Sequence, residues 1–229
     1  MTTHHRALML KHDTYSLPGS FADGLRERGF QVVEQRVDLD PGLPDPREFD
    51  TLLVMGSIWS VYDETIRPWF DGEVRAIRDA VEAKIPVLGV CFGAQALSHA
   101  LGGRVSRASE SEIGWTAIES EDQGRIDSGP WFQWHHDGFT LPPGGRTLAR
   151  NSVGIQAYEV GPHLGVQFHP EITLDVARIW LREGGDDLRQ AGVDPRAVLA
   201  ETEQIWLERR EAALRLLDRF LDGVREAVG

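Results

Sequence analysis

The first hundred residues alternate between short apolar runs and longer amphipathic stretches. Four apolar runs have the length and composition of buried strands: residues 6–11, 30–37, 51–55 and 85–90. Helices are expected between them over residues 20–28 and 63–84, and after the last of them from residue 91 to the glycine pair at 102–103. Ser20 is the expected N-cap of the first helix. This alternation predicts a parallel sheet with helices on both faces.

Residues 104–157 follow a different pattern, in which glycine and proline separate short apolar stretches. The expected strands are Val105 and residues 113–115, 116–119, 131–134, 147–149 and 155–160. We expect them to continue the sheet in antiparallel fashion rather than as further strand–helix–strand units. One more apolar strand, 164–168, leads directly into His169.

The C-terminal part has helical periodicity. One helix is expected over residues 174–182, and Gly184 and Gly185 interrupt it. A long helix is expected over residues 195–228, with Asp194 as its N-cap. One face of the long helix carries a repeating stripe: Val198, Thr202, Ile205, Arg209, Ala213, Leu216, Phe220 and Val224. The stripe favours packing on the sheet, and the alternative is a helix that binds a partner.

No repeat or low-complexity tract marks a domain boundary in the 229 residues. Apolar residues make up 41% and charged residues 26% of the chain, which is typical of a packed globular protein. We therefore predict one α/β domain over residues 1–172, with residues 173–229 as a helical extension packed on the same domain.

Charge and cysteine content narrow the class of protein. The net charge of −12 argues against a nucleic-acid partner. No apolar run is long enough for a membrane span, and the first residues carry too short an apolar run for a signal peptide. The single cysteine forms no disulfide within the chain and fits the reducing cytoplasm. The adjacent His4 and His5 are expected to lie at a disordered end rather than to bind a metal.

The only cysteine lies in a sharp strand-to-helix turn. Gly89-x-Cys91-x-Gly93 has the form of a nucleophile elbow with cysteine in place of serine. Small residues on either side permit the tight turn, and the N-terminus of the following helix favours a thiolate. The pattern predicts a nucleophilic Cys91, and the alternative is a buried structural cysteine.

A thiol nucleophile needs a base, and the base needs an orienting group. His169-Pro170-Glu171 supplies both at the end of one strand, because residues two apart on an extended chain point the same way. The C-terminal ends of parallel strands share one edge of a sheet, so Cys91, His169 and Glu171 are expected to meet there. Oxyanion donors are expected from the N–H of Phe92 and from the segment Gly56-Ser57, which follows another strand.

These two motifs together resemble the class I, or triad, glutamine amidotransferase family. The likeness rests on Gly89-Val-Cys91-Phe-Gly93-Ala-Gln95 and Gly165-Val-Gln-Phe-His169-Pro-Glu171, and it is strongest to stand-alone, GMP-synthase-like members. It implies a flavodoxin-like, three-layer α/β/α fold with a mixed, mostly parallel central sheet and a C-terminal helical extension. It also implies glutamine hydrolysis through a γ-glutamyl thioester on Cys91, with His169 and Glu171 completing the triad and Gln95 contacting the substrate.

Two segments depart from the family pattern. Gly56-Ser57-Ile58 stands where many members have Gly-Gly-Pro in the oxyanion loop. Trp134-His135-His136-Asp137 stands where a Ser-His-Gly-Asp-like segment borders the glutamine site. Trp134, His135 and His136 are therefore candidates for the substrate pocket, and the two histidines could instead be structural or ligate a metal. We predict no metal site and no cofactor.

The predicted reaction is hydrolysis of glutamine to glutamate and ammonia. The ammonia acceptor would be a separate synthase chain, because these residues hold no second catalytic domain. A homodimer is a further candidate assembly. The nearest alternative is a hydrolase of other γ-glutamyl amides or peptides with the same triad, and a non-catalytic regulatory module is a more distant one.

Overall fold

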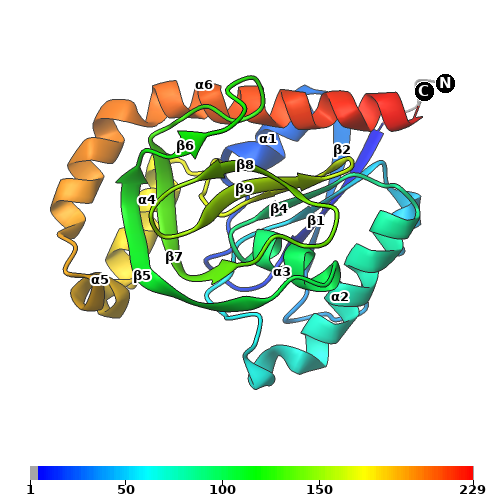
Figure 1. Ribbon diagram of the computed structural model, residues 1–229, viewed down its shortest axis with the longest axis horizontal. Coiled ribbons are helices and arrows are strands. Elements are labelled where there is room, and N and C mark those ends of the chain that lie inside the picture. The colour runs from blue at the N-terminus through cyan, green and yellow to red at the C-terminus, as the bar shows by residue number, and fades with distance from the viewer. Residues whose placement is uncertain (1–4, 229) are drawn as a thin grey trace.

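The computed structural model describes residues 5–228, whose central feature is an eight-stranded mixed sheet (Figure 1). The strand order is β2-β1-β3-β4-β10-β9-β8-β6. Five strands run parallel: β1 (His5–Lys11), β2 (Phe30–Arg36), β3 (Thr51–Val54), β4 (Val87–Val90) and β10 (His163–Val166). Three strands complete the sheet in antiparallel fashion: β9 (Ile155–Val160), β8 (Arg146–Arg150) and β6 (Glu119–Ser120). The predicted parallel sheet with an antiparallel continuation is confirmed.

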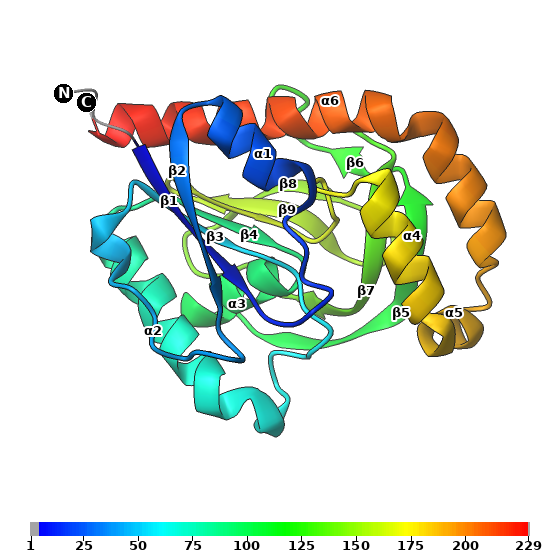
Figure 2. The same ribbon diagram turned by 180° about the vertical axis from the view of Figure 1, so that it is seen from behind.

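Helices cover both faces of this sheet because its central strands are apolar on both sides. Along β1, Leu8 and Leu10 pack in one core with α2 (Arg67–Glu82) and α3 (Phe92–Ala100). The alternate residues Ala7 and Met9 pack in a second core with α1 (Gly19–Glu27) and α6 (Pro195–Val228). Helices α1 and α6 lie side by side on that face (Figure 2). The three-layer α/β/α arrangement is therefore confirmed.

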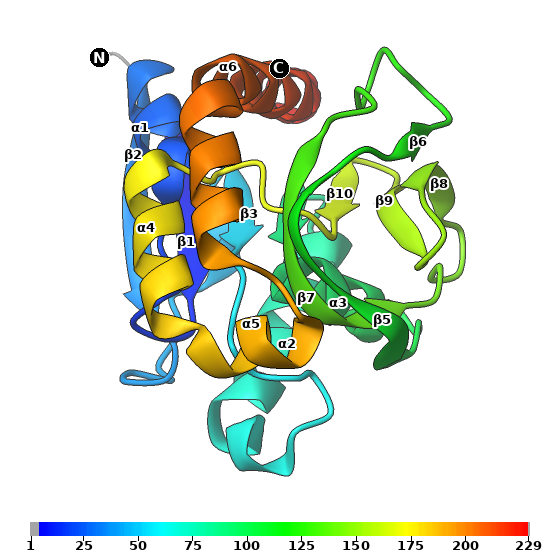
Figure 3. The same ribbon diagram turned by 90° about the vertical axis from the view of Figure 1, so that its left-hand side faces the viewer.

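Strands β5 (Val105–Thr116) and β7 (Trp131–Phe139) form a separate two-stranded antiparallel sheet. The stretches expected as separate strands at 105 and 113–115 are one strand, with a break in register between Arg107 and Glu112. These strands do not extend the main sheet, so that part of the expectation was wrong. Figure 3 shows the pair beside α5 (Gly185–Ala191). Since β7 runs on to Phe139, it carries the whole segment 134–137.

Several expected element ends differ in detail. Ser20 lies inside α1 rather than capping it, and the N-cap is Pro18, which makes no side-chain cap bond. The helix expected from Asp63 opens with a 3₁₀ turn, η2 (Glu64–Ile66), before α2 begins. A second 3₁₀ turn, η1 (Pro46–Glu48), lies in the connection before β3. His5 begins β1 rather than lying at a disordered end, and His4 is outside the described residues.

The C-terminal helices pack on the side of the sheet that carries α1. Helix α4 (Leu174–Glu183) ends at Gly184, but α5 follows at once, so the glycine pair separates two helices. Helix α6 spans the length of the molecule (Figure 1) and contacts α1, α4 and β5. Its predicted stripe is buried except for Ile205, which is half-buried. Within residues 5–228, no helix is long and apolar enough to cross a membrane.

Replacing Arg209 with methionine should loosen the packing of α6 on this core. The Arg209 guanidinium donates to Asp127 at 2.6 Å and to the Gly129 carbonyl at 3.2 Å, and it lies over the Trp131 ring at 4.6 Å. Methionine keeps the apolar contact but loses both hydrogen bonds and the charge. We expect the free energy of unfolding to fall by about 2 kcal/mol, a value discounted because Asp127 is partly exposed. Urea denaturation followed by circular dichroism measures it, and an unchanged midpoint would contradict it.

Candidate active site

Cys91 occupies a strained turn between β4 and α3. Its φ of +51° and ψ of −107° form a combination that residues other than glycine rarely adopt. Its N–H donates to the Val166 carbonyl at 2.8 Å, which ties the turn to the end of β10. An added Cβ at Gly89 would lie 2.4 Å from the Gly93 carbonyl oxygen, and one at Gly93 would lie 1.9 Å from that of Val54. The two glycines of the motif are therefore required by this turn.

His169 and Glu171 form a buried pair just beyond β10. Nδ1 of His169 lies 2.8 Å from Oε1 of Glu171, and the two side chains are 5% and 1% exposed. Burial lowers the pKa of His169, but the charges of Glu171 and Cys91 and hydrogen bonds to both outweigh it and raise the pKa to about 10. The imidazole is therefore protonated at neutral pH. The three residues singled out from the sequence come together at one edge of the sheet.

Two neighbouring helices hold this pair in place. The Trp180 ring of α4 packs edge-on against the His169 ring, with centroids 4.7 Å apart, and its Nε1 donates to the Tyr15 carbonyl at 3.0 Å. In α1, the N–H of Ser20 donates to the Glu171 carbonyl at 2.8 Å. Trp180 was not predicted as a site residue, because nothing in its sequence neighbourhood sets it apart from an ordinary core tryptophan.

The residues proposed as oxyanion donors lie next to the same pair. An added Cβ at Gly56 would lie 2.9 Å from Cε1 of His169 and 3.8 Å from Cβ of Cys91, so glycine is required there. Phe92 is the first residue of α3, where a backbone N–H has no acceptor within the helix. Ser57 and Phe92 both line the cavity that contains Cys91. Two N–H groups are thus available beside the sulfur.

A cavity of about 460 Å³ opens over Cys91. Its inner part is lined by the residues above together with Gln95 and the segment 134–137 of β7. Its outer wall is formed by residues 182–187, where α4 meets α5. This wall carries Glu183, Asp186 and Asp187 and a single cation, Arg182.

Gln95 lies one helical turn after Cys91 and is 3% exposed. Its Nε2 donates to Oε1 of Gln167 at 3.2 Å and to the Asp137 carbonyl at 3.4 Å. Gln167 in turn donates from Nε2 to the Cys91 sulfur at 3.6 Å. Gln167 was not predicted as a site residue, although it stands two positions before His169 and therefore points the same way along an extended chain.

Trp134 and His136 lie at the mouth of the cavity. The Trp134 carbonyl accepts from the Cys91 thiol at 3.7 Å, and its Nε1 donates to Asp187 at 3.2 Å. His136 lies 2.7 Å from the Ser111 hydroxyl through Nδ1 and 3.2 Å from the same Asp187 carboxylate through Nε2. The two side chains therefore tie β7 to α5 and the outer wall.

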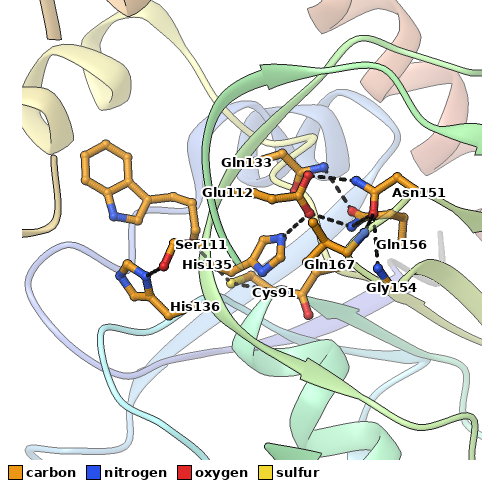
Figure 4. Close-up of polar contacts among 12 residues, drawn as sticks. Cys91, Ser111, Glu112, Gln133, His135, His136, Asn151, Gly154, Gln156 and Gln167 are labelled. Atoms are coloured by element: carbon orange, nitrogen blue, oxygen red, sulfur yellow. Dashed lines mark hydrogen bonds and ion pairs between the residues drawn. The ribbon is translucent and has the colours of Figure 1, made fainter. Parts of the chain in front are cut away.

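His135 is directed instead into a buried polar cluster behind Cys91 (Figure 4). Its Nε2 lies 3.1 Å from Oε2 of Glu112, and its Nδ1 lies 3.1 Å from the Asp137 carbonyl oxygen. The Glu112 carboxylate also accepts from Asn151 at 2.7 Å and from Gln156 at 2.9 Å. Glu112 comes from the break in β5, which the sequence did not reveal. Among residues 5–228, no group of three or more His, Cys, Asp or Glu side chains is placed to hold a metal ion.

Asp137 braces the segment that follows the oxyanion loop. Its carboxylate accepts from the Ser60 hydroxyl at 2.6 Å and from the Tyr62 hydroxyl at 2.8 Å. Asp13 does the same from the end of β1, accepting from the Ser57 hydroxyl at 3.2 Å and the Ile58 N–H at 3.1 Å. Neither Asp13 nor Tyr62 was singled out from the sequence, since loop contacts of this kind have no local pattern.

Comparison with known proteins agrees with this geometry. The model of the family described as glutamine amidotransferase class-I matches residues 12–181. The chain belongs to that family. The match covers both motifs and most of α4, so it extends beyond the boundary predicted at residue 172.

Class I glutamine amidotransferases are also among its sequence and structural relatives. The chain is 31% identical to one subunit of the glutamine-hydrolysing GMP synthase of Sulfolobus acidocaldarius, over 65% of this chain and 80% of that one. It is 28% identical to the GMP synthase of Idiomarina loihiensis, over 98% of this chain but 42% of that one. A glutamine amidotransferase structure from Thermotoga maritima superposes with a TM-score of 0.86 at 28% identity, over 95% and 98% of the two chains. The chain spans less than half the length of the GMP synthases that it matches first.

Proposed function

We propose that this class I glutamine amidotransferase hydrolyses the side-chain amide of glutamine to glutamate and ammonia. The observation that carries the proposal is the strained turn at Cys91, next to an imidazole that is itself held 2.8 Å from a buried carboxylate. A thiol, a base and an orienting acid in this arrangement form a nucleophilic triad. Family membership supports glutamine as the substrate.

In the proposed acylation, the Cys91 thiolate attacks the amide carbon and a carbon–sulfur bond forms. The carbonyl electrons move to oxygen, where the N–H groups of Ser57 and Phe92 stabilise the negative charge. The protonated His169 gives its proton to the amide nitrogen, the carbon–nitrogen bond breaks, and ammonia leaves. The raised pKa of His169 suits this step, because the proton is already on the imidazole when the substrate binds.

In the proposed deacylation, water attacks the γ-glutamyl thioester and His169 accepts a proton from it. The carbon–sulfur bond breaks, glutamate leaves with a carboxylate, and Cys91 returns as a thiolate. Glu171 holds the imidazole throughout and stabilises its positive charge. No cofactor takes part in this scheme.

We infer further roles for the remaining predicted residues. Gln95 and the edge of β7 at Trp134 would contact the bound substrate, with His136 at the mouth of the cavity. His135 would support this edge through Glu112 rather than touch the substrate. Gly56 would give the oxyanion loop its close approach to His169.

The acceptor of the ammonia would be a separate synthase chain. The relative in Sulfolobus acidocaldarius is by name one part of such a synthase, and another relative of the fold is part of the PurLQS assembly of Thermotoga maritima. We propose the cytoplasm as the location, on the ground of the single reduced cysteine. We also propose that residues 1–172 and the helical extension 173–229 form one unit, and that the chain can pair with a second copy.

A second candidate function is hydrolysis of larger γ-glutamyl amides by the same triad. The cavity favours it, because the space over Cys91 continues outward to the wall at residues 182–187. Such a substrate would place its γ-glutamyl group on Cys91 and its amine portion against that wall.

One experiment separates the two candidates. The purified protein is incubated with glutamine and with a panel of γ-glutamyl amides of increasing amine size, and glutamate, amine and ammonia are measured. Acid quenching and mass spectrometry then detect a γ-glutamyl group on Cys91, with Cys91→Ala protein as the blank. We expect glutamine to give the highest kcat/KM. A preference of tenfold or more for a larger amide would favour the second function, and hydrolysis without acylation of Cys91 would contradict both.

A further inference from the structure

The peptide bond between Gly56 and Ser57 is held from beneath by side chains that belong to no recognised motif. The Gly56 carbonyl oxygen lies 3.0 Å from Nδ1 of His12 and also accepts from the Ser16 hydroxyl. His12 stands directly after β1 and is completely buried. A carbonyl with two hydrogen bonds on its oxygen has little freedom to rotate.

The orientation of this carbonyl determines where the Ser57 N–H points. The two groups belong to one trans peptide, so they point in opposite directions. The carbonyl is directed to His12, which lies in the protein interior and does not line the cavity. The N–H of Ser57 is therefore directed away from His12, toward the side on which the Gly56 Cα faces His169 and Cys91.

A second buried group fixes the ring of His12. Nε2 of His12 lies 2.9 Å from Oε2 of Glu73 on α2, and both side chains are 0% exposed. The Gly56 carbonyl can only accept a hydrogen bond, so Nδ1 of His12 must carry a proton. Burial lowers the pKa of His12, but the charge of Glu73 and its hydrogen bond outweigh that effect and raise it. Glu73 therefore favours an imidazole with protons on both nitrogens.

The surrounding rings keep this pair dry and immobile. Phe92 and Trp69 pack on the His12 ring, with centroids 4.7 Å and 5.5 Å away. Phe92 is also the residue whose N–H is the second proposed oxyanion donor. A single buried cluster thus contacts both donors.

We propose that His12, Glu73 and Ser16 are positioning residues that hold the Gly56–Ser57 peptide with its N–H directed at the oxyanion. The proposal rests on the proposed glutamine hydrolysis. It explains how serine can replace the glycine found at position 57 in many relatives. The freedom of the peptide to turn is removed by hydrogen bonds to its carbonyl, so the loop depends less on the choice of residue.

The test is a pair of variants that differ only in the donor at position 12. Glu73→Gln is placed in both, so that no unpaired carboxylate remains buried. In His12→Asn/Glu73→Gln, the asparagine amide nitrogen is as many bonds from the main chain as Nδ1 and can still donate to Gly56. In His12→Leu/Glu73→Gln, a side chain of similar bulk donates nothing. We expect kcat for glutamine to fall about 100-fold with leucine and tenfold or less with asparagine, as for loss of one oxyanion donor.

Binding of the ground state should change little in these variants. An oxyanion donor acts mainly in the transition state, so KM should stay within about threefold of the wild type. Alkylation of Cys91 by iodoacetamide should keep its rate, because that reaction forms no oxyanion. Equal loss of kcat in the leucine and asparagine variants, or a slower alkylation matching the lost kcat, would overturn the positioning role.

A smaller effect is expected when the second hydrogen bond to the carbonyl is removed. Ser16→Ala should lower kcat three- to tenfold at unchanged KM. Ser98→Ala is its matched control, since Ser98 also donates from a hydroxyl to a backbone carbonyl, that of Thr140, at 2.8 Å. The control should stay within twofold of the wild type. Equal effects of the two substitutions would contradict the proposal.

Failure of the proposed function would leave a separate result. If the wild type forms no glutamate from glutamine, crystal structures of the wild type and of the His12→Leu/Glu73→Gln variant still test the peptide. We expect the Gly56 carbonyl to remain on His12 in the wild type and to turn in the variant. An unchanged peptide in the variant would show that the His12 side chain does not hold it.

Discussion

Replacing Cys91 with alanine should lower the turnover number for glutamine by about 10⁵-fold or more. The reaction then has no nucleophile, and only binding and the oxyanion donors remain to accelerate attack by water. His169→Gln should cost nearly as much, because the proton for the leaving ammonia is lost. Residues that act as a unit are not additive, so the double variant should be no slower than Cys91→Ala alone by more than a few-fold.

Glu171→Gln isolates the orienting role in the same triad. The amide is nearly isosteric with the carboxylate, but it has no charge to stabilise the imidazolium 2.8 Å away. We expect kcat to fall about 10³- to 10⁴-fold with little change in KM. The pH profile should change as well, because the charge that raises the pKa of His169 is gone and the imidazole will lose its proton at lower pH.

Steady-state release of glutamate, followed from pH 5 to pH 10, measures these effects. Circular dichroism confirms that each variant is folded, and Ser98→Ala serves again as a control outside the site. Retention of more than about a hundredth of the wild-type kcat by Cys91→Ala would refute the thioester mechanism. Loss of activity in Glu171→Gln without any shift in the pH profile would argue that Glu171 is only structural.

Replacing Gly93 with alanine should destabilise the whole fold. The new Cβ would lie 1.9 Å from the Val54 carbonyl oxygen, a backbone atom in the central strand β3. No rotation of a side chain relieves this contact, so α3 must move away from the sheet. We expect the free energy of unfolding to fall by about 3 kcal/mol or more, at the upper end of the range for overpacked cores.

Gly223→Ala is the matched control for that prediction. Gly223 lies within α6, and an added Cβ there meets no atom within 4 Å. Alanine favours a helix interior, so this variant should gain up to about 1 kcal/mol. Thermal unfolding of the three proteins measures both changes. A Gly93→Ala variant as stable as the wild type would mean that the turn at Cys91 tolerates a looser contact with β3.

The strand and helix pattern could be predicted well where hydrophobic periodicity is strong. The runs at 6–11, 30–37 and 51–55 became β1, β2 and β3, and the long helix was predicted with its bounds. Prediction failed between residues 104 and 139. The break in β5 places Glu112 in the interior, and a separate sheet takes β7 out of the main one. A local pattern shows that a strand forms but not which neighbour it pairs with.

For the site, the sequence by itself determined the residue types that need each other. The glycine spacing around Cys91 requires a tight turn, and His169-Pro-Glu171 puts a base and a carboxylate on one side of an extended chain. Both requirements are local, within a few bonds, so they can be read from the order of the residues. Belonging to a family known by these two motifs followed from the same stretches.

Only the tertiary structure decided what surrounds them. His12 and Glu73 are 61 positions apart, and Trp180 is far along the chain from Tyr15, yet each pair is in contact. The same holds for Glu112 and His135, which turns one of two adjacent histidines away from the substrate cavity. Contacts between distant segments arise from the packing of whole strands and helices, so no local spacing encodes them. The nucleophilic turn is therefore a property of a short stretch, and its oxyanion loop, its base and its cavity are properties of the folded chain.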